Sequence, residues 1–301
     1  MPATHATAAD VAQGLRDVGY LPDDATTLVS FLAAKLGKPI LVEGPAGVGK
    51  TQLAKSLAET FGRELVRLQC YEGLDEAKAL YEWNYRKQLL RIQAEADGTG
   101  WSEVQDDIFG EEFLLARPLL TAIASKEPVV LLIDEIDKTD QEFEAMLLEL
   151  LSDFQITIPE LGRIEATTMP IVLLTSNNTR ELTEALKRRC LYLWLDYPDL
   201  EHELAIVRLH APELDEHVAR RLVEVVGLVR DLDLKKPPSI AESIDWARAL
   251  LLLGAQDIDA KVFTDTMSVI VKHRTDLDVV TERVGVKLGL AEDSLGAASA
   301  G

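Results

Sequence analysis

Two patterns of apolar residues alternate along the first two thirds of the chain. Helical spacing over residues 23–36 and 51–61 predicts two amphipathic helices. Short apolar runs predict five strands, at residues 39–43, 64–70, 129–133, 170–175 and 191–195. Because these strands alternate with helices, the pattern predicts an α/β fold built on a parallel sheet with helices on both faces.

Two insertions interrupt this alternation, and the pattern then changes. Residues 72–113 are aromatic and acidic, with a helix predicted around 87–95, and residues 155–168 alternate as a hairpin does, after a helix at 141–154. From 199 to 290 helical spacing dominates. We therefore expect a first domain over residues 1–198, a smaller all-α domain over 199–290, and a tail over 291–301 whose composition predicts disorder.

Charge and composition narrow the class of protein. The 301 residues carry a formal net charge of −20, which argues against nucleic acid as the main partner, because duplex binders need a basic face. A plain solvated acidic surface explains the same charge. Two separated cysteines fit a reducing compartment, and the apolar runs are too short to span a bilayer. With no basic segment before an apolar run at the N-terminus, we expect a cytoplasmic protein.

A glycine-rich loop follows the first predicted strand and matches the phosphate-binding pattern G-x-x-x-x-G-K-[ST]. Its residues are Gly44, Pro45, Ala46, Gly47, Val48, Gly49, Lys50 and Thr51. Glycines let backbone N–H groups converge on phosphate oxygens, and the next helix adds its positive N-terminus. Lys50 supplies a charge for the β- and γ-phosphates, and Thr51 a hydroxyl for Mg²⁺. Because an apolar strand precedes this loop, we predict nucleotide binding rather than a chance match.

The wholly apolar run at 129–133 leads directly into Asp134 and Glu135. Such a run predicts a central strand buried on both faces. It delivers two carboxylates to the carboxyl edge of the sheet, where ligands bind in open α/β folds. We expect Asp134 to hold Mg²⁺ and Glu135 to act as general base toward the attacking water.

Three further candidates are weaker signals by themselves. Asn177 follows the fourth strand and would orient water, although Asn is also a common turn residue. Arg188 and Arg189 close a predicted helix, where one would reach a neighbouring subunit's γ-phosphate, or simply cap the helix end. Gln69 would hydrogen-bond Glu135 and hold it inactive, or be an ordinary solvated glutamine.

With these motifs in this order, the chain resembles an AAA+ ATPase, and more narrowly the MoxR branch, whose wider clade carries insertions at the places of 72–113 and 155–168. The segments CYEGLDEAKALYEWNY, LLELLSDFQITIPELG and ALKRRCLYLWLDYPD resemble the subgroup encoded near molybdenum hydroxylases of the carbon monoxide dehydrogenase type. The resemblance implies a P-loop NTPase core with a helical lid, ATP on the glycine-rich loop, Asn177 as sensor 1, and Arg189 as arginine finger with Arg188 in reserve.

The resemblance also implies partners. They are further copies of the chain in a ring, expected to be a hexamer, a protein with a von Willebrand factor A domain, and a client metalloenzyme matured by chaperone-like remodelling. Two departures from the family pattern stand out. Cys190 replaces the usual phenylalanine, and the lid helix opens at Ser239 with no arginine before Arg248, which leaves open whether Arg248 substitutes for the usual lid arginine.

Other functions are also compatible with these motifs. A DNA-acting motor shares the same core, but the charge of −20 weighs against it. A small-molecule kinase on a P-loop seldom carries a helical domain of this size. The aromatic residues Tyr71, Tyr81, Trp83 and Tyr85 would either grip a client or pack an insertion onto its domain, and packing is the commoner role.

Overall fold

The computed structural model describes residues 6–94, 109–159 and 161–287 of the chain, so the tail predicted to be disordered, 291–301, lies outside the described residues. The chain divides into two compact units. The first contains Lys50–Leu195 and the chain before Pro45, and the second contains Pro45–Gly49 together with the chain from Asp196 onward. Five residues of the glycine-rich loop, 45–49, therefore group with the C-terminal unit, whereas Gly44, Lys50 and Thr51 belong to the first.

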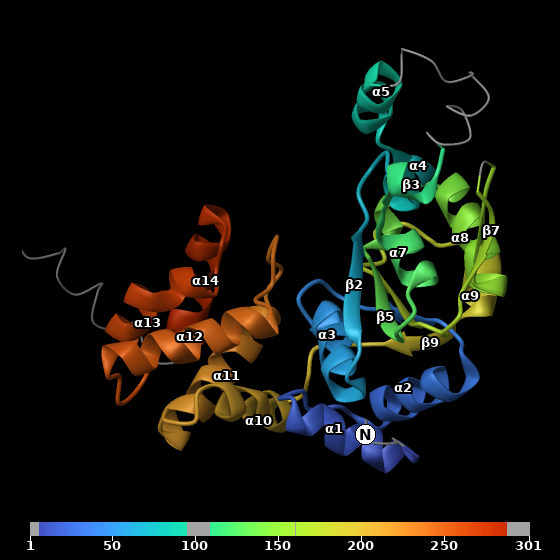
Figure 1. The fold of residues 1–301 in the computed structure, drawn as a ribbon. Helices are drawn as coiled ribbons and strands as arrows, with labels where there is room; N and C mark the ends of the chain where they lie inside the picture. The colour runs from blue at the N-terminus through green and yellow to red at the C-terminus, as the bar shows by residue number, and fades with distance from the viewer. Residues whose placement is uncertain (1–5, 95–108, 160, 288–301) are drawn as a thin grey trace, which may run out of the picture. The chain divides into compact units, whose positions relative to one another are not determined.

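A five-stranded sheet forms the centre of the first unit (Figure 1). Its strands are β1 (Ile40–Glu43), β2 (Glu64–Gln69), β5 (Val129–Asp134), β8 (Ile171–Ser176) and β9 (Leu191–Trp194). They lie in the order β2-β5-β8-β1-β9, and neighbouring strands are parallel. The predicted parallel α/β sheet is confirmed, with each strand end within one residue of the predicted position.

Helices cover both faces of this sheet. Every residue of β5 is buried, as a central strand requires. Leu131 and Ile133 point to the face where α7 (Pro118–Ala124) and α8 (Gln141–Asp153) pack. The helix α3 (Lys50–Phe61) also contacts β5. The helix α1 (Ala8–Asp17) packs against α3, and α2 (Asp24–Leu36) packs against α1, β1 and β9. The apolar pattern did not predict α1, which presents only a short buried stripe but begins in a capping box made by Thr7 and Asp10.

The first insertion forms short elements whose buried residues join the core of the first unit. Its elements are α4 (Glu76–Ala79), β3 (Tyr81–Trp83), α5 (Tyr85–Ala94), η1 (Glu111–Phe113) and β4 (Leu114–Ala116). The antiparallel β3–β4 pair was not predicted. The aromatic residues have different environments: Trp83 is buried and meets Tyr81 edge-on at 6.2 Å, whereas Tyr71 and Tyr85 are exposed. The packing interpretation therefore holds for only part of the group.

The second insertion is the predicted hairpin, formed by β6 (Gln155–Ile158) and β7 (Gly162–Glu165). Ile156 and Ile158 are buried, and the hairpin packs against α7 and α8. The short helices η2 (Ile136–Lys138) and α9 (Glu184–Arg189) complete the regular elements that matter for the site.

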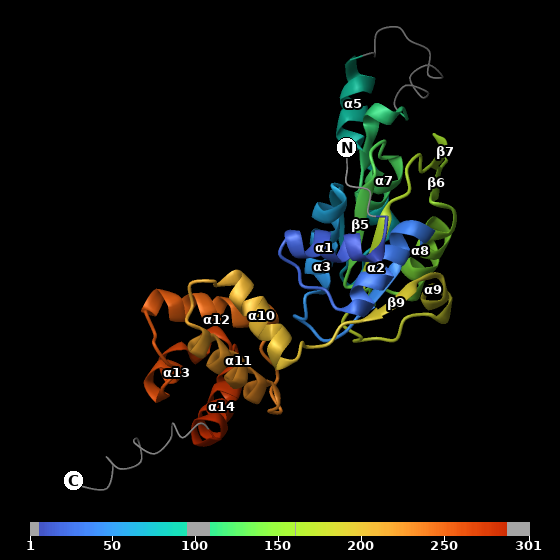
Figure 2. The same cartoon turned by 90° about the horizontal axis from the view of Figure 1, so that it is seen from below.

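The regular elements described in the second unit are all helical, as the pattern over 199–290 predicts (Figure 2). They are α10 (Leu200–His210), α11 (Glu216–Arg230), α12 (Ile240–Leu253), α13 (Ala260–Thr266), η3 (Met267–Val269) and α14 (Arg274–Lys287). Trp246 is fully buried in their common core, and its indole N–H donates to Thr266 Oγ1 at 2.8 Å. Ser239 begins α12 with a capping box that includes Glu242.

Candidate active site

The strand order brings the predicted polar residues of the first unit to one edge. Gln69 pairs in register with Asp134, because β2 and β5 are neighbouring parallel strands. Asn177 follows directly after β8, the strand on the other side of β5. The carboxyl ends of parallel strands lie at the same edge of a sheet, so Gln69, the Asp134–Glu135 pair and Asn177 meet there.

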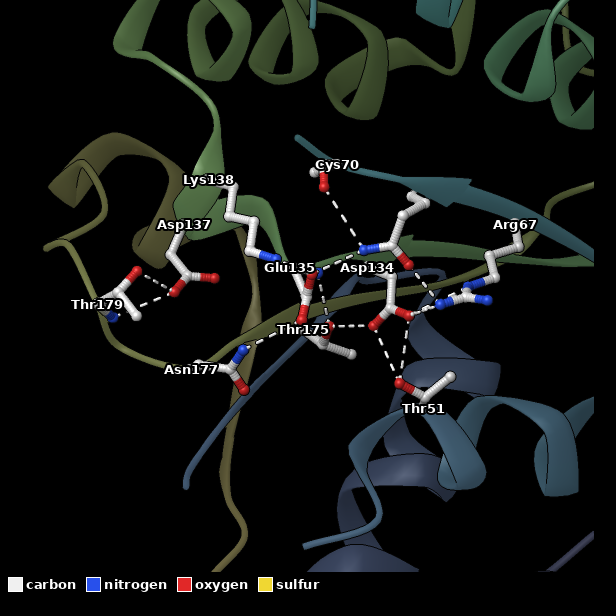
Figure 3. Close-up of polar contacts among 11 residues, drawn as sticks. Thr51, Arg67, Cys70, Asp134, Glu135, Asp137, Lys138, Thr175, Asn177 and Thr179 are labelled. Atoms are coloured by element: carbon white, nitrogen blue, oxygen red, sulfur yellow. Dashed lines mark hydrogen bonds and ion pairs between the residues drawn. The ribbon is translucent and has the colours of Figure 1, made fainter. Parts of the chain in front are cut away.

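Asp134 is buried and surrounded by donors (Figure 3). Thr51 Oγ1 donates at 3.1 and 3.2 Å to the two carboxylate oxygens, and Thr175 Oγ1 donates to Oδ1 at 2.5 Å. Arg67 Nη2 lies 2.6 Å from Oδ2 and its Nε lies 3.1 Å from the same oxygen. A buried carboxylate needs such partners, since burying an unpaired charge is costly.

Glu135 sits in a strained backbone conformation just after the strand. Its φ of 60° and ψ of 49° are left-handed, a region that costs a non-glycine residue about 1 kcal/mol or more. The backbone N–H of Glu135 donates to Thr175 Oγ1 at 2.9 Å, which anchors the turn to β8. Strained residues cluster at functional sites, where the surrounding contacts hold them in place.

The Glu135 carboxylate accepts hydrogen bonds from three other side chains. Gln69 Nε2 donates to Oε2 at 2.8 Å, so the predicted contact between Gln69 and Glu135 is confirmed. Lys138 Nζ lies 2.5 Å from the same oxygen, and this hydrogen bond raises the pKa of Lys138. Asn177 Nδ2 lies 3.4 Å from Oε1. Both oxygens of the Glu135 carboxylate thus accept hydrogen bonds from side chains of the same protein chain.

Lys50 begins α3 and is 93% buried, with 7% of its surface exposed. Its Nζ donates to the carbonyl of Gly44 at 2.7 Å. Burial lowers the pKa of Lys50, and the acidic side chains of Asp137, Asp134 and Glu135 oppose that shift. The charged Lys50 ammonium group is therefore stabilised by these nearby carboxylates. A bound nucleotide would bring its Mg²⁺ to the same carboxylates.

The middle of the glycine-rich loop is held by residues of its own unit. The Ile240 N–H donates to the Gly47 carbonyl at 3.2 Å, and Tyr197 Oη donates to the Ala46 carbonyl at 3.0 Å. At Gly47, φ is +81° and an added Cβ would lie 2.3 Å from Ser239 Cβ. Only glycine fits there. Gly47, at a position that the motif pattern leaves variable, therefore contacts the start of α12.

The arginine candidates lie elsewhere in the fold. Arg188 and Arg189 occupy the exposed last turn of α9, as predicted, and Arg189 contacts the hydroxyl of Ser152 at the end of α8. In the second unit, Arg248 is exposed and lies 3.9 Å from Asp245 on its own helix. Cys190 follows α9 as a free, partly buried thiol.

Sequence reasoning missed two residues that touch Asp134. Thr175 is followed by Ser176, and these two polar residues end a strand that is otherwise apolar, which was a usable signal. Arg67 precedes Gln69 by two positions, and alternation along a strand puts both side chains on the same side. Neither contact with Asp134 can be recognised from the sequence alone, because the order of the strands in the sheet decides it.

Thr51 and Asp134 offer the hard oxygen atoms that Mg²⁺ prefers. Within the described residues no group of three or more His, Cys, Asp or Glu side chains is placed to hold a metal ion. The pair nevertheless fits Mg²⁺, because this ion is usually bound by one or two protein oxygens, with water and substrate phosphates completing its shell. In the same described ranges no helix is both long enough and apolar enough to cross a membrane.

Comparison with known families agrees with this geometry. Residues 40–193 match the model of the ATPase family associated with various cellular activities (AAA). The chain belongs to the AAA ATPase family. It is therefore a nucleotide-binding protein that hydrolyses ATP, and the match spans the strands and loops described above.

Named relatives and solved structures are distant. Gas vesicle ATPase GvpN of Haloferax mediterranei is 24% identical over 76% of this chain and 66% of its own length. Gas vesicle ATPase GvpN2 of Halobacterium salinarum is 26% identical over 87% of this chain and 80% of its own. A mutant RuvB structure from Thermotoga maritima superposes with a TM-score of 0.51 at 17% identity, covering 96% of this chain and 85% of that one. That similarity shows the fold alone.

Proposed function

We propose that this ATPase is a MoxR-type remodelling machine in which Asp134 and Glu135 serve the reaction. The arrangement around β5 is the observation that supports it: Thr51 is bonded to Asp134, while Glu135 lies between Gln69 and Asn177. The order of motifs and the two insertions support the MoxR interpretation. The narrower resemblance to the carbon monoxide dehydrogenase subgroup rests on the quoted sequence segments.

Each residue has a distinct part in the proposed reaction. The glycine-rich loop, residues 44–51, cradles the phosphates, and Lys50 neutralises charge that develops on the γ-phosphate. Thr51 and Asp134 hold Mg²⁺, which when bound polarises the phosphates of ATP. Glu135 accepts the proton of the attacking water, and Asn177 orients that water. Gln69 keeps Glu135 away from the water until the complex is assembled.

The proposed machine is a ring, with six copies as the expected number. Arg189 is exposed, so it is available to reach the γ-phosphate bound by a neighbouring copy, with Arg188 in reserve. We propose that a von Willebrand factor A-domain protein and a client metalloenzyme are the partners, and that they act in the cytoplasm. The gas vesicle names of the relatives make a gas vesicle component the alternative client.

The test replaces Glu135 by Gln. This change removes the general base but keeps the size of the side chain, so ATP turnover should fall about 100-fold or more. ATP binding should persist, and the nucleotide-bound oligomer should become more stable. Exposed Glu142 on α8 provides the control, since Glu142→Gln makes the same change of charge. Unchanged turnover in the Glu135→Gln variant would refute the assigned role.

A DNA-acting motor is the other candidate, favoured only by the fold it shares with RuvB. The formal net charge of −20 argues against it. Binding of duplex DNA at low salt, with ATP turnover stimulated by DNA, would establish the motor and overturn the remodelling proposal. Transfer of phosphate to a metabolite instead of water would identify a small-molecule kinase.

A further inference from the structure

Asp134 already has a cationic partner in the structure. The Arg67 guanidinium places Nη2 at 2.6 Å and Nε at 3.1 Å from Oδ2 of Asp134. Two N–H groups on one carboxylate oxygen make a directed, charge-assisted contact. Thr51 Oγ1, 3.2 Å away, donates to that same oxygen. The arginine thus occupies the side of the carboxylate that also faces the threonine assigned to Mg²⁺.

The exposure of the two partners is unequal. The Asp134 side chain is 3% exposed and the Arg67 side chain is 46% exposed. A buried carboxylate needs a nearby positive charge, whereas a half-exposed arginine is solvated when it leaves. Arg67 comes from β2, an edge strand of the sheet, and its guanidinium reaches Asp134 at the end of the neighbouring strand β5 (Figure 3). The difference in exposure therefore suits an arginine that neutralises Asp134 only until another cation replaces it.

The same guanidinium is also joined to the general base. Arg67 Nη2 donates to Gln69 Oε1, and Gln69 Nε2 donates to Glu135 Oε2 at 2.8 Å. A chain of hydrogen bonds thus runs from Asp134 through Arg67 and Gln69 to Glu135. If Arg67 moves away, the Gln69 amide oxygen loses its donor, and the amide is held only through Nε2, which donates to Glu135 and to the Cys70 carbonyl. Moving Arg67 therefore changes how firmly Gln69 holds Glu135.

We propose that Arg67 is a resident counter-cation of Asp134 that gives way to Mg²⁺ when nucleotide binds, and that its withdrawal loosens the hold of Gln69 on Glu135. Two positive charges cannot share one small carboxylate site without repulsion. Metal binding and the Arg67–Asp134 contact therefore oppose each other. This proposal rests on the proposed assignment of Thr51 and Asp134 to Mg²⁺. It makes Arg67 a positioning residue, through which metal binding releases Glu135 from its hydrogen bond with Gln69.

The experiment measures metal binding directly in the full chain. Mn²⁺ replaces Mg²⁺ as the probe, and its binding is followed by electron paramagnetic resonance with a non-hydrolysable ATP analogue. In the Arg67→Gln variant the competitor is gone, so the Mn²⁺ concentration for half-saturation should fall roughly threefold to tenfold. Arg63→Gln is the matched control, because Arg63 lies just before the same strand and bonds the Met169 carbonyl instead. It should bind Mn²⁺ as the wild type does.

Thermal unfolding supplies a second readout that does not depend on activity. In EDTA the Arg67→Gln variant leaves the buried carboxylate without its cation, so it should melt at a lower temperature than the wild type. Mn²⁺ with the analogue should then raise its melting temperature by more than it raises that of the wild type. A merely structural arginine would lower the melting temperature in both conditions equally.

The outcomes separate the two proposals. If wild-type Mn²⁺ binding does not require nucleotide, or persists in Asp134→Asn, the metal assignment fails and the role of Arg67 fails with it. If the wild type behaves as assigned but Arg67→Gln binds Mn²⁺ equally or more weakly, only the counter-cation role is overturned. Weaker binding would mean that Arg67 supports the metal-bound state.

Discussion

The hydroxyl of Thr175 is hydrogen-bonded to both Asp134 and Glu135. Replacing Thr175 by Val tests how much these two hydrogen bonds contribute. The hydroxyl donates to Asp134 at 2.5 Å and accepts the Glu135 N–H at 2.9 Å. Val is nearly the same size but offers neither bond. Because Thr175 is buried, water cannot replace the lost contacts.

The magnitude follows from those two contacts. A hydrogen bond to a charged group contributes about 1.5–3 kcal/mol, and a buried N–H left unsatisfied costs about 1–3 kcal/mol. Asp134 Oδ1 keeps the Thr51 hydroxyl at 3.1 Å, which offsets part of the loss. We therefore expect Thr175→Val to destabilise this part of the sheet by about 2–4 kcal/mol.

Hydrogen exchange of the β5 and β8 amides, measured by mass spectrometry, reports the loss of stability within the first unit alone. An increase of about 30-fold to about 700-fold in exchange rate corresponds to that free energy. Thr175→Ser is the control: it keeps the hydroxyl and loses one methyl group, which is worth about 0.8 kcal/mol. If the Val and Ser variants exchange alike, the hydroxyl does not support the two carboxylate positions and the reasoning is wrong.

Two further predictions concern other buried groups. Arg230 and Glu203 form a buried ion pair with contacts of 2.5 and 2.8 Å, so Arg230→Met should destabilise the second unit by about 3–5 kcal/mol, measured by urea unfolding. Adding Glu203→Leu should recover part of that loss, and a purely additive double variant would contradict the pairing. Burial raises the pKa of the Cys70 thiol from 9.0 to about 12, so iodoacetamide should react slowly with the folded chain. Above pH 9 only the unfolded thiol loses its proton, so stability should fall as pH rises toward 12, and less so in Cys70→Ala.

Much of the fold was predictable because its signals are local. The apolar runs predicted the five strands of the sheet, and apolar–polar alternation predicted the β6–β7 hairpin. The β3–β4 pair inside the first insertion was missed, since its strands are three residues each and separated by more than 30 positions. Short strands leave too few residues for alternation to be recognised. The helix α1 was missed for a related reason, as only three of its residues are buried.

Sequence alone predicted which residue types would carry the chemistry of this ATPase. The spacing of Gly44, Lys50 and Thr51 is a local property of one turn, and Asp134 with Glu135 follows from one buried strand. Tertiary structure alone decided that Arg67, 67 positions earlier, neutralises Asp134, and that Thr175, 41 positions later, supports it. Those contacts depend on the order β2-β5-β8, which places strands from distant parts of the chain side by side. Periodicity tells which face a residue occupies, but only the pairing of strands tells which side chain it meets.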